Sequence, residues 1–169
     1  MGDYMLIDSH CHLVNEDYDI DEVIERAKIA GVNYLIVSGS EREDNKMNMS
    51  LLDKYDNVFL SVGFHPSMAS SVTGNDFKFL EECLMNDKVV AIGEIGLDYH
   101  YGKEDMEKQK DLFRKQLDIA KKYNKPVVIH TRDAFLDTYN ILREYNLSGV
   151  IHCFSGSLEV AKQYLTQVI

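Results

Sequence analysis

Val89-Val90-Ala91-Ile92-Gly93-Glu94 is an almost wholly apolar run that leads directly into a carboxylate. A short, continuous apolar run is typical of a strand that is buried on both faces of a parallel sheet. Because an isolated buried carboxylate is strongly disfavoured, Glu94 must bind a metal ion or another cation, or be protonated. A structural salt bridge is the plainer alternative, and the rest of the chain bears on the choice.

The same arrangement recurs at other predicted strands, where an apolar run leads into a histidine. Side chains alternate along a strand, so His10 and His12 lie on one face with their Cβ atoms roughly 6.5–7 Å apart. That spacing suits two imidazoles that bind one ion. The histidines that follow predicted strands are His10, His12, His65, His130 and His152.

Amphipathic helices are predicted between these strands. Asp19 to Glu22 has the pattern of a capping box, and Gly31 is a plausible stop for the helix that follows. β and α segments alternate six times in this way, without a linker or a change of composition. The inward faces expected for the second and sixth helices include Met47, Leu51, Leu52, Leu158, Ala161, Leu165 and Val168.

Two architectures fit this alternation, a doubly wound open sheet and a (β/α)8 TIM barrel. The histidines and Glu94 stand at or just past the carboxyl ends of their strands, where barrel enzymes assemble their active sites. No glycine-rich phosphate loop follows the first strand, which counts against a nucleotide-binding doubly wound fold. We therefore predict an α/β fold of the TIM-barrel type, with about six βα units in this chain.

Glu94 and four of the histidines are predicted to form a metal site. Four imidazoles and one carboxylate exceed the three or four protein ligands of a single catalytic ion, whereas two ions bridged by Glu94 would use them all. Cys11 and Cys153 each follow a candidate ligand, so both are expected to point away from the interior as small buried side chains. The predicted metal ligands are His10, His12, Glu94, His130 and His152.

Two further residues are placed to meet a substrate. His65 stands beside a proline, and Arg132 follows His130 by two residues, so we predict that both act in catalysis together with Glu94. For Arg132 the alternative is a salt bridge to Asp133 or Asp98 across the strand ends. His100 lies in a polar loop and is expected to be exposed.

Composition and charge narrow the class of protein. The chain has 169 residues, 45% of them hydrophobic, and a net charge of −10 from 28 acidic and 18 basic side chains. This charge argues against broad adhesion to nucleic acid or anionic lipid, but not against a phosphate-bearing substrate at a metal site. Three widely spaced cysteines and no membrane-length apolar run predict a cytoplasmic protein that does not enter a membrane.

Five motifs in this chain resemble those of the TatD family of metal-dependent deoxyribonucleases, in the amidohydrolase superfamily. They occur in family order and span nearly the whole chain. The motifs are Asp8-Ser9-His10-Cys11-His12-Leu13, Gly63-Phe64-His65-Pro66, Gly93-Glu94-Ile95-Gly96-Leu97-Asp98-Tyr99, His130-Thr131-Arg132-Asp133-Ala134 and His152-Cys153-Phe154-Ser155-Gly156.

This resemblance implies a distorted (β/α)8 barrel with a centre of two divalent metal ions (Mg, Mn or Zn). It implies that His10 and His12 hold one ion, that His130 and His152 serve the other, and that Glu94 bridges them. The implied activity is hydrolysis of phosphodiester bonds in DNA, with exonuclease action. DNA or another phosphodiester is then the partner, and the sequence names no protein partner.

One departure from the family pattern is expected to matter. Members carry a further metal-ligating aspartate on an eighth strand, and eight βα units imply roughly 225–250 residues. We therefore expect residues 1–169 to be a single TatD-like hydrolase domain that is incomplete at its C-terminus. Two alternatives to the nuclease remain open, a non-catalytic fragment of such an enzyme and an amide or ester hydrolase of the same superfamily.

Overall fold

In the part of the chain that the structure describes, the sheet consists of six parallel strands in sequence order. The computed structural model describes residues 5–13, 19–102 and 104–167. Strands and helices alternate as predicted, and every neighbouring pair of strands is parallel. The elements are β1 (Leu6–Cys11), α1 (Ile20–Ile29), β2 (Val32–Ser38), α2 (Arg42–Leu51), β3 (Val58–Val62), the short 3-10 helix η1 (Pro66–Met68), α3 (Gly74–Cys83), β4 (Val89–Asp98), α4 (Met106–Tyr123), β5 (Val127–Arg132), α5 (Phe135–Leu142), β6 (Gly149–Ile151) and α6 (Leu158–Gln167).

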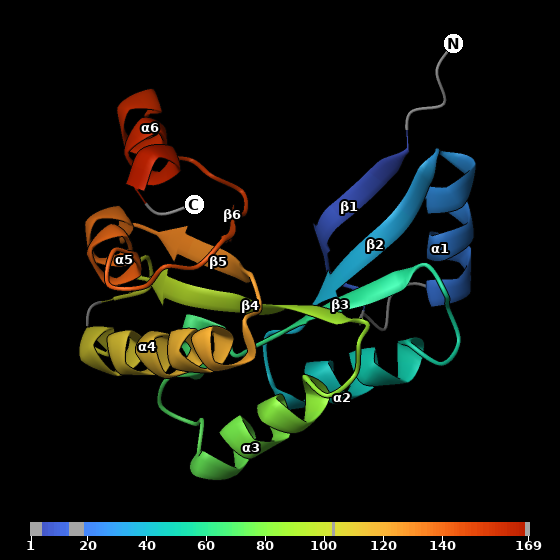
Figure 1. Cartoon of the computed structure of the whole chain (residues 1–169), viewed down its shortest axis with the longest axis horizontal. Coiled ribbons are helices and arrows are strands. Elements are labelled where there is room, and N and C mark those ends of the chain that lie inside the picture. Colours follow the sequence, from blue (N-terminus) through green and yellow to red (C-terminus); the bar gives the residue numbers. More distant parts are fainter. Residues whose placement is uncertain (1–4, 14–18, 103, 168–169) are drawn as a thin grey trace.

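The strand order is β1-β2-β3-β4-β5-β6, so each strand pairs with the next one along the chain. A doubly wound sheet reverses its order at a switch point, whereas a barrel adds its strands in sequence. Figure 1 shows the sheet curled, with helices on its outer side and β1 and β6 at its two edges in the described part of the chain. The predicted TIM-barrel type of fold with about six βα units is confirmed.

Local sequence explains where the helices begin and end. The Asp19 carboxylate accepts the backbone N–H groups of Asp21 and Glu22, which caps α1. Gly31, with φ of +86°, follows the end of α1 in the left-handed region that favours glycine. Asn124 takes the corresponding left-handed position after α4. The predicted stop of α1 at Gly31 is therefore confirmed.

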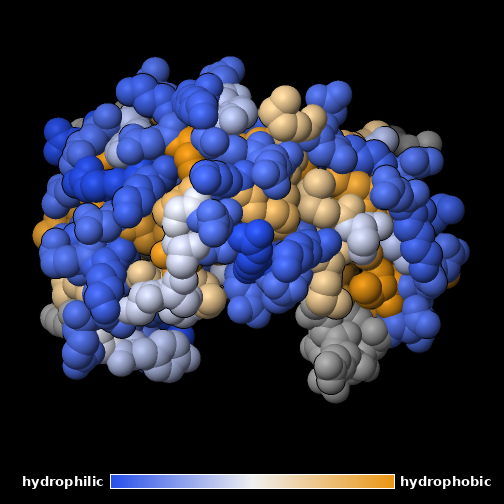
Figure 2. Space-filling view, turned by 90° about the horizontal axis from the view of Figure 1, so that it is seen from below, coloured by the Kyte–Doolittle hydropathy of each residue, from blue (hydrophilic) through white to orange (hydrophobic). Residues whose placement is uncertain are grey.

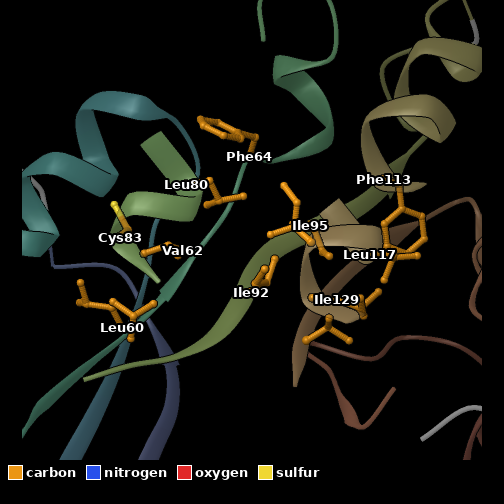
Figure 3. Packing of buried hydrophobic residues seen from close by; sticks show 14 of the residues in the cluster. Leu60, Val62, Phe64, Leu80, Cys83, Ile92, Ile95, Phe113, Leu117 and Ile129 are labelled. Carbon is orange, nitrogen blue, oxygen red and sulfur yellow. The ribbon is translucent and has the colours of Figure 1, made fainter. Parts of the chain in front are cut away.

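The hydrophobic core lies between the sheet and the helices that cover it. Phe113 and Leu117 of α4 are fully buried against β4 and β5, and Leu80 of α3 is buried toward β3. The outer face in Figure 2 is mostly hydrophilic, with apolar side chains exposed only in part of it. In the part of the chain that the structure describes, no helix has both the length and the apolar character needed to cross a membrane.

Two predicted helix faces are wrong in part. Met47 of α2 is 52% exposed, and Asn45 and Asn48 face the core instead. In α6, Leu158 and Leu165 are exposed while Tyr164 is buried. Hydrophobicity alone misassigned both faces, because the buried amide of Asn45 and the buried phenol of Tyr164 each find hydrogen-bond partners. Val168, also predicted to face inward, lies outside the described residues.

Buried amides fix the loop that follows β3. Asn45 Nδ2 donates to the Gly63 carbonyl at 2.7 Å, and Gly63 N donates back to Asn45 Oδ1 at 3.4 Å. Gln116 from α4 makes the same pair of contacts with Phe64, at 2.8 and 2.9 Å. These contacts hold the backbone immediately before His65 and thereby set the position of that histidine.

Replacing Gln116 with leucine is expected to destabilise the fold by about 1–3 kcal/mol for each of the two Phe64 backbone groups left without a partner. Leucine fills a similar volume but offers neither a donor nor an acceptor. Urea unfolding of both proteins measures the difference. Lys121→Leu on the exposed side of the same helix is the control and is expected to change stability by less than about 0.5 kcal/mol. Equal stability of Gln116→Leu and the wild type would contradict this role.

Candidate metal centre

The site begins at the carboxyl end of β1. His10 is the penultimate residue of the strand, and His12 lies just past its end. The Asp8 carboxylate accepts the His10 backbone N–H at 3.1 Å, and the Ser38 hydroxyl lies 3.0 Å from His10 Nδ1. With Nδ1 engaged by Ser38, the Nε2 atom of His10 faces Glu94. His10 and His12 thus point to one place, as the sequence predicted.

Glu94 is at the centre of the site and is only 4% exposed. Its Oε2 atom lies 3.5 Å from His10 Nε2 and 3.4 Å from His12 Nε2. Its Oε1 atom lies 2.7 Å from His130 Nδ1 and 2.6 Å from His152 Nε2. Each carboxylate oxygen therefore faces two imidazoles, and all five predicted ligands meet at one carboxylate.

The predicted position of Glu94 at the end of its strand is wrong. β4 continues to Asp98, so Glu94 lies inside the strand. The pairing of β4 with β5 is irregular between Ile92 and Ile95, and Glu94 N donates across to the Gly39 carbonyl at 3.1 Å. This irregularity in the β4–β5 pairing occurs at Glu94 itself.

The electrostatics of the site follow from this crowding. Burial opposes ionisation of Glu94, but hydrogen bonds from His12, His130 and His152 hold its pKa well below the usual range. The hydrogen bond to Glu94 raises the pKa of His12. Burial disfavours the charged form of His130, but Glu94 and then Asp98 raise its pKa above the ordinary value. Burial and the neighbouring His152 lower the pKa of His10 to about 4. A divalent cation would replace the imidazole protons that form hydrogen bonds to the Glu94 carboxylate.

Three of these donor atoms are close enough to surround one ion. His130 Nδ1 and His152 Nε2 are 3.4 Å apart, and each is within 2.7 Å of Glu94 Oε1. Donor atoms of His10, Glu94 and His152 also lie within 4.8 Å of one another, and the rings of His10 and His152 stack at 4.0 Å. His152 therefore lies close to His10 as well as to His130, so the histidines around Glu94 form one continuous cluster in the described part of the chain.

A second group contains a residue that sequence reasoning did not place in the metal site. His65, Asp98 and His130 offer ligand atoms within 4.8 Å of one another, and Asp98 is 9% exposed. Asp98 lies four residues after Glu94 on the same strand. Side chains alternate along a strand, so this even spacing is a signal that could have identified it.

The other predicted residues lie around this centre. The ring of His65 contacts that of His130 edge-on, with centroids 4.5 Å apart. Burial lowers the pKa of His65 to about 4, helped by the nearby His130. Arg132 is exposed and lies over the ring of Tyr101, 5.3 Å from its centroid.

The structure also shows the contacts and exposure of the residues that neighbour the predicted site. Asp133 contacts His100 Nδ1 at 3.1 Å, and the Asp98 carboxylate contacts His130, so both predicted salt-bridge partners of Arg132 are engaged elsewhere. His100 is exposed, as expected. Cys11 is partly buried and its thiol lies 3.7 Å from the Ile36 carbonyl. The prediction of a buried Cys153 is wrong, because this residue is exposed, in a turn with φ of +46°.

The donor set fits a divalent metal. A carboxylate that is 4% exposed meets four imidazoles, and imidazole nitrogen with carboxylate oxygen is the ligand mixture of Zn²⁺ and Mn²⁺ sites. A curled parallel sheet that carries such a centre on the carboxyl side of its strands is typical of metal-dependent hydrolases with a TIM-barrel type of fold.

Comparison with known proteins identifies the family. A family model described as TatD related DNase matches residues 7–169, and the chain belongs to this family. The resemblance inferred from the five motifs is therefore confirmed.

Individual relatives agree with this placement. The chain is 43% identical over 119 residues to the uncharacterized metal-dependent hydrolase YabD of Bacillus subtilis, covering 69% of this chain and 47% of that protein. It is 32% identical over 104 residues to the 3'-5' ssDNA/RNA exonuclease TatD of Cronobacter sakazakii, covering 62% of this chain and 40% of that protein. The chain spans about half the length of the curated relatives it matches.

A solved structure shows the same fold. The TatD homologue YjjV of Escherichia coli superposes with a TM-score of 0.87 at 34% identity. The match covers 96% of this chain and 65% of that one. The curled sheet with its covering helices is thus the architecture of a TatD homologue.

Proposed function

We propose that this chain hydrolyses phosphodiester bonds in single-stranded DNA or RNA, removing nucleotides from the 3′ end, with two divalent ions bridged by Glu94. One observation carries this proposal: each oxygen of a buried carboxylate faces two imidazoles. The exonuclease named among its relatives supports the substrate class and the polarity. We also propose that residues 1–169 belong to one hydrolase domain.

The two oxygens of Glu94 suggest how the ligands divide. The pair that faces Oε2, His10 and His12, would hold one ion, and the pair that faces Oε1, His130 and His152, would hold the other. Nitrogen ligands in this number favour Zn²⁺ or Mn²⁺ over Mg²⁺. When bound, such ions supply Lewis acidity, which activates water and neutralises charge on the phosphate.

His65 is suited to donate a hydrogen bond to a phosphate oxygen. Its Nδ1 atom accepts the backbone N–H of Ser67 at 3.2 Å, so the proton of a neutral His65 is on Nε2. Arg132, at the exposed end of β5, offers the planar pair of donors that matches a phosphate. These two side chains would orient the substrate at the ions.

A cavity beside His65 is a candidate place for the base of a nucleotide substrate. It has a volume of about 260 Å³ and is lined by His65, Pro66, Asp98, Tyr101, Glu104 and Asp105, among others, and its three acidic residues disfavour a phosphate there. The Tyr101 side chain is 86% exposed, and an exposed aromatic ring is a platform on which a base can stack. Since the net charge is −10, phosphate recognition has to come from the ions and Arg132 rather than from the general surface.

The cytoplasm is the compartment we propose for this reaction. Cys11, Cys83 and Cys153 are all free thiols. Burial raises the pKa of Cys83 to about 11, which keeps that thiol protonated and unreactive. Free, unpaired cysteines suit a reducing environment.

The proposed activity is tested with a single-stranded oligonucleotide labelled at its 5′ end. We expect the manganese- or zinc-loaded protein to produce a ladder of progressively shorter labelled products, because removal from the 3′ end leaves the label on the remaining strand. Immediate release of a labelled mononucleotide would contradict the 3′ polarity. No cleavage of this strand, together with turnover of a lactone or p-nitrophenyl ester, would assign the centre to acyl hydrolysis instead.

A further inference from the structure

The carboxylate of Asp98 is held at the end of β4 by one contact at each of its oxygens. Its Oδ1 atom accepts the His100 backbone N–H at 2.9 Å, and its Oδ2 atom lies 3.1 Å from His130 Nε2. Gln109, a buried residue of α4, bonds to both backbone groups of Asp98, at 2.8 and 2.9 Å. Neither the strand end nor the carboxylate is free to turn, so Asp98 presents Oδ2 to His130 in a fixed direction.

His130 lies between two carboxylates and uses a different ring nitrogen toward each. Its Nδ1 atom faces Glu94 Oε1 at 2.7 Å, and its Nε2 atom faces Asp98. A neutral imidazole has one N–H and one lone pair, and an ionised carboxylate can only accept. When a cation occupies the Glu94 side, the single N–H must therefore point to Asp98, and the lone pair of Nδ1 points to the cation.

We propose that Asp98 is a positioning residue that sets the tautomer of His130, so that Nδ1 binds the ion shared with Glu94 and His152. This inference rests on the proposed function only in requiring an ion at that place. A histidine ligand that donates its other N–H to a carboxylate is held in orientation and made more basic. The His65 ring, edge-on at 4.5 Å, also limits rotation of His130 about its own axis.

The same three residues suggest a rival arrangement, a cation bound directly by His65, Asp98 and His130. Two observations count against it. Nδ1 of His65 already accepts the Ser67 N–H at 3.2 Å, so in the neutral ring Nε2 carries the proton and has no lone pair for a metal. His130 would in addition have to give up its last proton to bind ions at both nitrogens. The experiment below distinguishes the two arrangements.

Asp98→Asn tests the inference, because asparagine keeps the shape but has only one acceptor oxygen. If that oxygen retains the His100 N–H, the amide NH2 faces Nε2 of His130 and forces the proton onto Nδ1, the metal-side nitrogen. We expect zinc affinity to fall about 10–100-fold, measured by competition with a chelator. Asp133→Asn is the matched control, since Asp133 is exposed and contacts the ring of His100; its zinc affinity is expected to be unchanged.

Long-range proton–nitrogen NMR of the zinc-loaded protein reads the tautomer directly, without any activity measurement. In the wild type we expect His130 to bind zinc through Nδ1 and to carry its proton on Nε2, and in Asp98→Asn we expect this signature to be lost while the signals of the other histidines persist. Zinc bound through Nε2 of His130 would overturn the inference and support the rival arrangement. Failure of the wild type to bind zinc at all would overturn the proposed function, and the inference with it. Circular dichroism would establish whether the variant is folded. Unchanged zinc affinity in a folded Asp98→Asn protein would also overturn the inference.

Discussion

Replacing Glu94 with glutamine is expected to abolish tight binding of divalent metal while leaving the fold intact. Glutamine keeps the volume, but it removes the negative charge of a carboxylate that faces four histidines at 2.6–3.5 Å. Loss of an outer partner of a metal ligand already weakens metal binding about 10–100-fold, so loss of the bridging charge is expected to cost more than about 100-fold. If two ions bind as proposed, we expect both to be affected, because each oxygen of Glu94 faces one pair of histidines.

Metal content by elemental analysis after dialysis against zinc measures this effect. Glu25→Gln, which removes the same charge from an exposed position on α1, is the control and is expected to retain the metal content of the wild type. Far-UV circular dichroism distinguishes loss of metal from loss of fold. A Glu94→Gln protein that still holds two ions would mean that the histidines bind metal independently of this carboxylate.

Replacing Gly96 with alanine is expected to destabilise the protein by about 2–6 kcal/mol, the sum of backbone strain and overpacking. Gly96 has φ of +144°, and a Cβ there would lie 1.9 Å from the carbonyl oxygen of His130. Gly96 pairs with His130 in the sheet, so the clash would push β5 away from β4 at the metal ligand itself. Weaker zinc binding is expected along with the loss of stability.

Gly74→Ala is the matched control for this substitution. Gly74 is the first residue of α3, and nothing lies within 4 Å of the position that its Cβ would take. Alanine there is expected to change stability by less than about 1 kcal/mol. Thermal unfolding of the two variants at pH 7.5 gives the comparison. Equal melting temperatures for Gly96→Ala and Gly74→Ala would contradict the prediction and would mean that β4 and β5 can shift to accommodate a Cβ at Gly96.

The course of β4 and β5 could be predicted because the residues at 89–93 and 127–129 form uninterrupted apolar runs. The run at 89–93 has no polar residue, and the histidines after the other runs mark the carboxyl edge of a parallel sheet. This pattern predicts that Glu94 and the four histidines lie in one site. The structure brings these five side chains together at a single carboxylate.

Apolar runs did not identify Asp98, although its even spacing from Glu94 on β4 is a signal that could have done so. It lies beyond the apolar run, and its burial depends on Gln109, a polar residue that belongs to another element and lies 11 positions away. Likewise, Asn45 faces the core because it bonds to Gly63, 18 residues away. Hydrophobic periodicity carries no information on such polar partners, so it placed Met47 inside and overlooked the buried amides.

Anomalous diffraction from crystals soaked in manganese or zinc would locate any ions bound at Glu94. We expect two peaks roughly 3.5–4 Å apart, one on each side of the Glu94 carboxylate, which is the usual separation in two-metal centres. The first would touch His10 and His12, and the second would touch His130 Nδ1 and His152. A single peak, or peaks away from Glu94, would contradict a centre of two ions bridged by this carboxylate.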